Sequence, residues 1–450
     1  MHDLGTTLAA VATAAGRGGV GCVRISGPDA FALARSLFRP RGALELPGDG
    51  RPRFGTFTDV LGVPLDHGYL VAFSGERAYT GEPTVELWAH GSPPVLEALT
   101  RAAIAAGASP AGPGEFTYRA LRNGRLDLAR AEAVRDLIAA RTLYQARVAF
   151  QQVEGAMARR LAPLREALID LIARGEAAIE FADEAETHLA ADALAKGVAE
   201  ASALGQALLG EGRRGRIVRE GARVALFGVT SVGKSSVFNR LLGIDRAIVS
   251  PVPGTTRDTL EETVEFDGIP VTFVDTAGLR PTPDAVEAEG VRRARHAANE
   301  ADLVLLVLDA GRELRDDERA ALAERASITL TPSIIVANKI DLPEARSPWP
   351  GAVPISAQTG DGFTALRSAI VLSLGASSMA ESPVLTNARH VVALEELVAA
   401  LARAGTATAL GDEIVLEEIR AALHAVGEII GDVANDDLYD RIFSTFCIGK

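Results

Sequence analysis

A glycine-rich segment near the middle of the chain has the residue types and spacing of a phosphate-binding loop. It runs from Gly228 to Ser235, follows the apolar stretch 224–227 and opens a helical pattern. Backbone N–H groups of such a loop wrap phosphate oxygens at a helix N-terminus, while Lys234 reaches the β- and γ-phosphates and Ser235 can ligate Mg²⁺. The segment therefore predicts a nucleotide site. Its predicted contacts are Ser231, Val232, Gly233, Lys234, Ser235 and Ser236.

Two later segments can complete the magnesium and γ-phosphate site. Asp275 follows the apolar stretch 271–274 and can hold Mg²⁺ through water, and the amide of Gly278 can sense a γ-phosphate. The segment 254–258 is typical of a mobile switch in which Thr256 meets both Mg²⁺ and the γ-phosphate. The predicted contacts of these segments are Gly254, Thr255, Thr256, Asp275, Thr276, Ala277 and Gly278.

A third motif selects the base. The sequence Asn-Lys-Ile-Asp at 338–341 follows the apolar stretch 334–337, and its Asp341 is placed to accept hydrogen bonds from N1 and N2 of guanine. Because adenine offers an acceptor where Asp341 needs a donor, the motif predicts GTP rather than ATP. The motif set resembles that of translation-factor-like GTPases. The predicted contacts with the base are Asn338, Lys339, Asp341, Ser356 and Ala357.

The group that orients the attacking water is not fixed by these motifs. Ras-like enzymes place a Gln directly after the Asp-x-x-Gly motif, but this chain has Leu279 there. Glu287 or Glu289 could orient the water, and either could equally be a solvated charge on a helix surface. No arginine finger can be identified, and a bound cation could supply the positive charge that the transition state needs.

Apolar periodicity indicates which elements position these residues in a multidomain chain. Residues 1–120 combine Gly and Pro with short β-branched runs, an α+β pattern, and helical spacing begins after them. Residues 223–374 alternate apolar strands with helical stretches, as a parallel sheet does, and helices then resume. We predict one discontinuous α-helical bundle with an inserted α/β P-loop GTPase (Ras-like) domain; two separate helical domains are the alternative. The predicted domains are 1–120, 121–221 with 377–450, and 222–376.

The composition excludes several classes of protein. The chain has 450 residues, 48% hydrophobic and 23% charged, and a formal net charge of −13. These proportions are those of a soluble globular protein, and the acidic balance argues against gripping nucleic acid over a broad basic face. Cys22 and Cys447 cannot form a disulfide framework, and no apolar run approaches the length of a membrane span. We expect a cytoplasmic protein with no membrane contact, and a buried thiol at Cys22.

Segments at both ends of the chain resemble the MnmE (TrmE) family of tRNA-modification GTPases. The sequence 441–450, which ends in Phe-Cys-Ile-Gly-Lys, carries this resemblance most specifically, together with the segment 16–27. Further similar segments are 80–82, 113–117 and 123–128, so the resemblance covers essentially the whole chain.

Membership of this family would imply a particular reaction and partner. The resemblance implies an N-terminal domain that binds a tetrahydrofolate derivative (5,10-methylene- or 5-formyl-tetrahydrofolate) and mediates dimerisation. It implies a heterotetramer or larger complex of the homodimer with MnmG (GidA), which carries FAD. Such complexes add an aminomethyl or carboxymethylaminomethyl group to C5 of the wobble uridine, position 34, of certain tRNAs. GTP hydrolysis, stimulated by K⁺ and by G-domain dimerisation, drives the cycle.

The resemblance also assigns roles to single positions. It makes Glu287 the residue that orients the hydrolytic water. The family usually has Asn where this chain has Ser231, so we expect K⁺ stimulation to be present but weakened. The implied folate contacts are Arg24, Glu86, Lys450 and, where the family commonly has Lys, Arg125. The implied potassium ligands are Ser231, Ser250, Val252 and Thr255, and the GTP contacts extend to Ser250, Val252 and Pro253.

Two interpretations of Cys447 remain. Cys447 beside Phe443 and Phe446 indicates packing, whereas the resemblance favours a role as nucleophile toward C6 of the uridine or as a thiol beside the folate.

A regulatory ribosome-assembly-type GTPase without covalent chemistry is the alternative interpretation of the whole chain, and such a GTPase would usually carry a basic RNA-binding module. Residues 1–221 carry 25 basic and 26 acidic side chains, which favours the modification enzyme. We expect tRNA phosphates to be bound largely through MnmG.

Overall fold

The structure is a computed structural model in which the chain divides into two compact units. The first unit comprises Met1–Arg135, Val153–Ala158 and Val426–Lys450, and the second comprises Asp136–Gln152 and Arg159–Ala425. The domain boundaries predicted from the sequence stay predictions. The structure describes residues 5–42, 45–46, 48–180, 188–229, 231–244, 260–275, 300–327, 331–345, 349–375, 385–407, 411–431 and 436–450.

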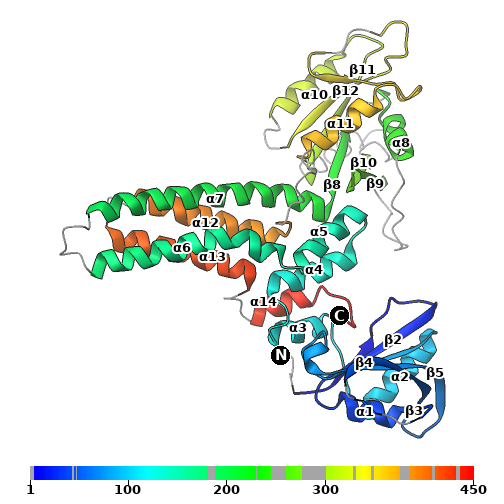
Figure 1. Ribbon diagram of the computed structural model, residues 1–450. Coiled ribbons are helices and arrows are strands. Elements are labelled where there is room, and N and C mark those ends of the chain that lie inside the picture. The colour runs from blue at the N-terminus through cyan, green and yellow to red at the C-terminus, as the bar shows by residue number, and fades with distance from the viewer. Residues whose placement is uncertain are drawn as a thin grey trace. The chain divides into compact units, whose positions relative to one another are not determined.

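Seven strands of the described residues form the sheet of the first unit, in the order β3-β4-β5-β6-β2-β1-β7. Figure 1 labels β2, β3, β4 and β5 of this sheet. Neighbouring strands are antiparallel, except that β7 runs parallel to β1. The strands are β1 (Leu8–Val11), β2 (Gly18–Ser26), β3 (Phe38–Pro40), β4 (Asp49–Thr58), β5 (Pro64–Phe73), β6 (Thr84–Gly91) and β7 (Ser109–Pro110), with α1 (Ala30–Leu37), the 3-10 helix η1 (Gly75–Arg77) and α2 (Pro93–Ala105) between them.

Alternation along β2 and β6 separates a core face from a polar face. Val23 and Ile25 of β2 and Leu87 of β6 are fully buried in the core that contains α1 and α2. Successive strand residues point to opposite faces, so Arg24 and Glu86 lie on the other face. The register of the two strands pairs these two residues directly. The fold therefore sets a cation and a carboxylate side by side.

Three short helices and the last residues of the sequence form a second, aromatic core in the first unit. The helices are α3 (Glu115–Arg122), α4 (Leu128–Ala139) and α14 (Asp436–Phe443). Tyr118 of α3 contacts the rings of Tyr439 and Phe443 edge to face. A single β-bridge between Pro113 and Ile448 then attaches the tail to the segment before α3.

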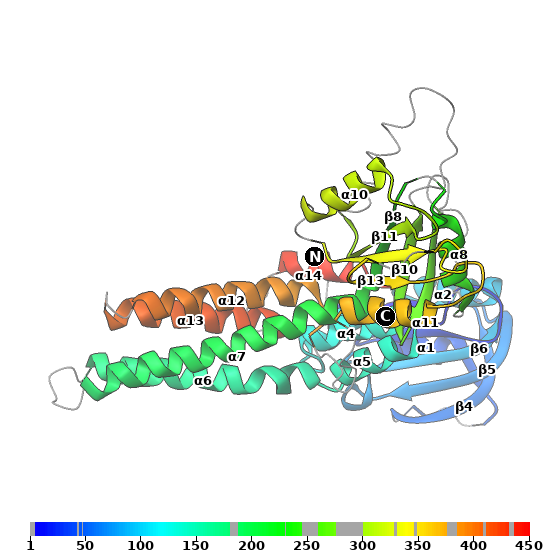
Figure 2. The same cartoon turned by 90° about the horizontal axis from the view of Figure 1, so that it is seen from above.

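Long helices form the bundle seen in Figure 2. They are α6 (Ala156–Glu180), α7 (His188–Glu220), α12 (Ala388–Ala407) and α13 (Asp412–Ile430), and α5 (Leu143–Val153) precedes them. Ion pairs join successive helices around the bundle: Arg160–Glu211 at 3.0 Å, Arg213–Glu395 at 2.8 Å, Arg403–Glu418 at 2.7 Å and Arg420–Glu176 at 2.8 Å. The helical texture predicted on both sides of residues 222–376 is confirmed. None of the helices in the described ranges is long and apolar enough to cross a membrane.

The second unit also contains a six-stranded sheet in the order β13-β12-β11-β8-β10-β9, counted over the described residues. Neighbours are parallel except β9 and β10. All seven residues of β11 are buried, because its side chains pack alternately with α8 and α11 on one face and with α10 on the other. The predicted α/β P-loop fold is confirmed. Its elements are β8 (Ala222–Phe227), α8 (Lys234–Ile244), β9 (Leu260–Phe266), β10 (Ile269–Asp275), β11 (Leu303–Asp309), α10 (Asp316–Ser327), β12 (Ser333–Asn338), β13 (Ala352–Pro354) and α11 (Phe363–Ser373).

Candidate functional site

The P-loop lies where the strand order of the second sheet reverses. β8 is flanked by β11 on one side and β10 on the other, and ligands of such sheets bind at the carboxyl ends of the strands beside this point. The loop leaves β8 after Phe227 and enters α8 at Lys234. Gly233 has φ +93°, and a Cβ there would collide with the side-chain amide of Asn338. Glycine therefore lets the loop close against the base-binding motif.

Lys234 is held inside this loop. Its side chain is buried, and Nζ donates to the carbonyl oxygens of Gly228 and Val229 at 2.7 and 2.8 Å. These bonds fix a cation at the N-terminus of α8, where it can exchange carbonyl oxygens for phosphate oxygens. The arrangement fits the β- and γ-phosphates of a nucleotide.

The guanine motif forms the floor of the site. Asn338 Nδ2 donates to the Val232 carbonyl at 2.9 Å, and the Ala357 amide donates to Asn338 Oδ1 at 3.0 Å. Ser356 Oγ donates to Asp341 Oδ1 at 2.6 Å, which orients that carboxylate. The structure thus brings together the P-loop and both predicted base-binding segments.

Asp309 and Glu318 are additions to this floor that sequence reasoning missed. Lys339 Nζ donates to Ser231 O at 2.9 Å and to Asp309 Oδ2 at 2.7 Å. Arg312 lies 3.4 Å from the same carboxylate oxygen and pairs with the fully buried Glu318 at 2.7 Å. These contacts orient Lys339. Asp309 directly follows the apolar run of β11, a position that could have marked it.

Several predicted residues of the nucleotide site lie outside the described residues, and one has only its backbone described. Asp275 ends β10, and only its backbone is described. Leu279 and Glu289 lie outside the described residues, as does the predicted water-orienting Glu287. Among the described residues, no group of three or more His, Cys, Asp or Glu side chains is arranged to hold a metal ion. The further predicted contacts outside the described residues are Ser250, Val252, Pro253, Gly254, Thr255, Thr256, Thr276, Ala277 and Gly278.

The first unit contains a second candidate site, which we call the cradle: Arg24, Glu86 and Lys450. Arg24 donates to Glu86 Oε1 through Nη2 at 2.9 Å and through Nε at 3.1 Å. Its guanidinium also lies 5.6 Å from the ring centroid of Phe116, which packs beneath it. Burial and the nearby Arg24 charge lower the pKa of the Lys450 ammonium, although Glu86 opposes this shift. Two partly buried cations beside one carboxylate fit an anionic ligand.

The tail residues hold the cradle in place through their backbone. Arg24 Nη1 donates to the Gly449 carbonyl at 3.4 Å, and the Phe116 amide donates to the Lys450 carbonyl at 3.2 Å. Cys447 is exposed, and its carbonyl accepts from the Gly114 amide at 3.3 Å. The exposed thiol of Cys447 therefore lies on the same short tail as Lys450 and outside the neighbouring aromatic core.

Arg125, the fourth position assigned to folate, is exposed on the loop after α3. No contact between its side chain and Arg24 or Lys450 is found among the described residues. Its side chain lies beside Gly81, since a Cβ at that glycine would lie 3.3 Å from Arg125 Cγ.

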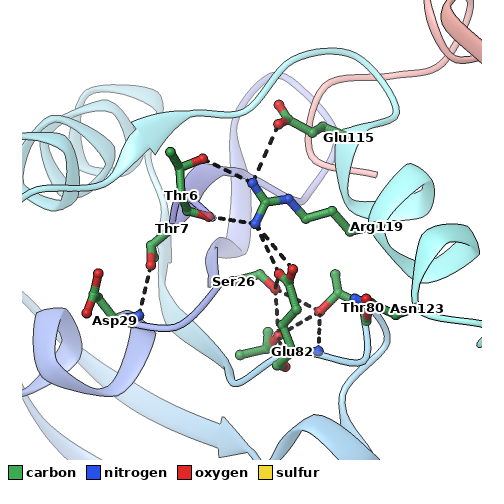
Figure 3. Close-up of polar contacts among 10 residues, drawn as sticks. Thr6, Thr7, Ser26, Asp29, Thr80, Glu82, Glu115, Arg119 and Asn123 are labelled. Carbon is green, nitrogen blue, oxygen red and sulfur yellow. Dashed lines mark hydrogen bonds and ion pairs between the residues drawn. The ribbon is translucent and has the colours of Figure 1, made fainter. Parts of the chain in front are cut away.

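A buried ion pair behind the cradle was not predicted from the sequence (Figure 3). Arg119 of α3 is fully buried, and its Nη1 lies 3.1 Å from Glu82 Oε2 while its Nη2 lies 3.7 Å from Glu115 Oε1. Ser26 Oγ lies 2.7 Å from Thr80 Oγ1 and donates to Glu82 at 3.3 Å. The pair ties α3, under Arg24, to the loop that leads into the strand of Glu86. In the sequence, the segments 80–82 and 113–117 indicate only a resemblance to the family.

Comparison with known proteins covers the whole chain. The model of the MnmE helical domain matches residues 128–447, and that of the GTP-binding protein TrmE N-terminus matches residues 7–125. The tRNA modification GTPase MnmE of Symbiobacterium thermophilum is 43% identical over 460 residues, 99% of both chains. That of Myxococcus xanthus is 43% identical over 455 residues, 100% of both chains.

The sheet order, the P-loop and the guanine floor define a P-loop GTPase. The full-length matches identify a narrower group than the class of P-loop GTPases. The chain belongs to the MnmE family.

Proposed function

We propose that this chain hydrolyses GTP within a tRNA-modification complex. Its full-length relatives are named tRNA modification GTPases. The observation that carries the proposal is the cradle, because a GTP-dependent switch alone has no use for it. Arg24 pairs with Glu86 at 2.9 Å beside the partly buried Lys450, in the unit that does not contain the nucleotide motifs. A cation pair of this kind fits a carboxylate-bearing cosubstrate.

In the nucleotide site, Lys234 binds the β- and γ-phosphates and Asp341 binds guanine. Ser235 and Thr256 hold Mg²⁺, and Glu287 orients the attacking water. Bound Mg²⁺ and K⁺ supply positive charge to the phosphoryl group during transfer. Potassium is held by Ser231, Ser250, Val252 and Thr255.

The anionic groups of 5,10-methylene- or 5-formyl-tetrahydrofolate are bound by Arg24 and Lys450 of the cradle and by Arg125. Glu86 is already held by Arg24 and by Trp88, whose Nε1 donates to Oε2 at 3.1 Å. These contacts orient the carboxylate toward a polar group of the ligand before it binds, which lowers the ordering cost of binding.

The further steps involve other chains. The chain forms a homodimer and joins MnmG, which carries FAD, in the cytoplasm. The folate supplies the one-carbon unit for the aminomethyl or carboxymethylaminomethyl group on C5 of the wobble uridine, position 34. MnmG binds most of the tRNA phosphates, because residues 1–221 carry 25 basic against 26 acidic side chains and the whole chain has a formal net charge of −13.

Cys447 provides the test of the covalent part of the proposal. We expect Cys447→Ser to abolish wobble-uridine modification in the reconstituted complex and to leave GTP hydrolysis unchanged. Cys22→Ala is the matched control, since Cys22 is 1% exposed and burial raises the pKa of its thiol to about 12. Full modification by Cys447→Ser would show that the exposed thiol has no role in the reaction.

A further inference from the structure

A cavity of about 580 Å³ in the first unit has a cationic lining. It lies between the loop after α3, the start of α4, the end of α13 and α14. Arg122, Arg125 and Arg130 line it, against Asp127 as the one carboxylate among its described lining residues. This local positive charge stands against a chain net charge of −13. The volume is within the range of roughly 300–1,000 Å³ usual for small-ligand sites.

The walls of this cavity are fixed by packing and hydrogen bonds. Asp127 Oδ1 accepts from the backbone amide of Arg130 at 2.7 Å and so caps α4. The Arg130 Nε donates to the Val153 carbonyl at 2.7 Å, which anchors the side chain through one of its five donors. Tyr439 on the opposite wall is buried in the aromatic core. The cations therefore line a preformed hollow.

Arg125 joins this cavity to the cradle. The same loop carries Asn123, whose Nδ2 donates to the Thr80 carbonyl at 2.7 Å. The hydroxyl oxygens of Thr80 and Ser26 lie 2.7 Å apart, and Ser26 is two residues from Arg24 on β2. Arg125 therefore lines the cavity on a loop that is bonded, through Asn123, Thr80 and Ser26, to the strand of Arg24.

We propose that the cavity binds the γ-linked glutamate residues that extend a tetrahydrofolate, with their carboxylates received by Arg122, Arg125 and Arg130. This inference rests on the proposed binding of folate in the cradle. Each added γ-glutamyl residue brings one more carboxylate, and guanidinium groups pair with carboxylates in two parallel hydrogen bonds. The triglutamate has two more carboxylates than the monoglutamate, and two added pairs near the upper end of the strength usual at exposed sites strengthen binding about tenfold.

The alternative anion is an RNA phosphate, and the structure favours the glutamates. RNA binding requires cations spread along a surface, and residues 1–221 carry 25 basic against 26 acidic side chains. Three arginines in one hollow of small-ligand volume, next to the cradle, match a short chain of carboxylates.

The test compares 5-formyltetrahydrofolate as its monoglutamate and its triglutamate, by calorimetry on the full chain at fixed ionic strength. We expect the triglutamate to bind the wild-type chain about tenfold more tightly. Arg122→Gln should reduce that ratio several-fold while leaving monoglutamate affinity unchanged. Arg51→Gln is the matched control, because Arg51 is an exposed cation (85%) on β4, and it should preserve the ratio. Arg130→Lys is the second cavity variant should Arg122→Gln fold poorly.

Each contrary outcome has its own meaning. Equal binding of the two forms by the wild-type chain would overturn the inference and leave the folate proposal standing. Binding of neither form would remove the folate proposal, and the inference with it. If Arg122→Gln kept the ratio but weakened tRNA binding with a shallower salt dependence, the cavity would be an RNA phosphate site and the inference would be wrong.

Discussion

The cradle and the nucleotide site hold their cations in different ways. In the nucleotide site, Lys234 bonds two carbonyls of its own loop, within six residues. In the cradle, Arg24 bonds Glu86 and Gly449, which are 62 and 425 residues away in sequence. A phosphate is bound by consecutive backbone amides, so one short loop suffices. A cradle for a larger ligand needs side chains whose places are set by the sheet and by the tail.

This difference predicts where each site is vulnerable. The nucleotide site depends on local loop geometry, so single substitutions there should remove activity and leave the rest of the chain intact. The cradle depends on long-range contacts, above all on the buried pair of Arg119 with Glu82 and Glu115. Substitutions there should affect folding of the first unit.

Arg119→Met should produce the largest loss of stability. It leaves two carboxylates, 14% and 8% exposed, without the cation between them, and removing one partner of a buried ion pair costs about 3–5 kcal/mol. Urea unfolding followed by probes in each unit would measure this cost, with the loss confined to the first unit. Arg101→Met is the control, since the Arg101 side chain is 67% exposed on α2 and its loss should cost under about 0.5 kcal/mol. Equal effects of the two substitutions would contradict the role given to the buried pair.

Lys234→Ala should reduce kcat for GTP hydrolysis by about 100- to 1,000-fold, because it removes the cation fixed over the phosphates. Folate affinity should not change, since the cradle belongs to the other unit. Steady-state hydrolysis and calorimetry measure the two quantities. Lys196→Ala, at a lysine that is 80% exposed on α7, should retain both. Loss of folate binding in Lys234→Ala would mean that the sites are not independent.

The affinity of the cradle for folate should fall as pH rises, by several-fold at alkaline pH. Burial and Arg24 lower the pKa of Lys450, so its ammonium loses its proton at a lower pH than a solvated lysine does. The anionic ligand binds the protonated form, and affinity is therefore lost as pH passes through the lowered pKa. In Lys450→Arg the cation persists at all accessible pH values, and the affinity should become independent of pH. A wild-type profile as flat as that of Lys450→Arg would show that Lys450 does not contact the ligand.

Ser231→Asn should have the smallest effect, a few-fold increase in the stimulation of GTP hydrolysis by K⁺. Ser231 has φ +70°, a conformation that Asn adopts more readily than Ser, and an amide reaches further than a hydroxyl. Hydrolysis rates in K⁺ and Na⁺ at matched ionic strength give the ratio for both forms. Equal rates in the two salts for the wild-type chain would refute its dependence on potassium.

The parts that the sequence predicted well are those determined by neighbouring residues. The P-loop follows directly from Gly228 to Ser235, and the uniform apolar run of β11 predicts a strand covered on both faces. Cys22 is buried as its apolar strand indicated. These features need no knowledge of distant segments.

The buried pair and the basic cavity could not be predicted, because they exist only when distant segments meet. Arg119 looks like any helical arginine until β6 brings the loop of Glu82 against it. Arg122, Arg125 and Arg130 are close in sequence, but the hollow that they line exists only once α13 and α14 supply its other wall. The strand β4, rich in Gly, Pro and Arg, likewise has little strand signal of its own and forms by pairing with β3 and β5.

The central claim is that one chain couples a GTP site to folate-dependent chemistry on tRNA. Mass spectrometry of tRNA nucleosides from cells that lack this gene tests it most directly. We predict that the aminomethyl and carboxymethylaminomethyl groups on the wobble uridine disappear, and that they return with the wild-type chain but not with Cys447→Ser. Normal wobble modification in cells without the gene would contradict the account and favour a GTPase switch without covalent chemistry.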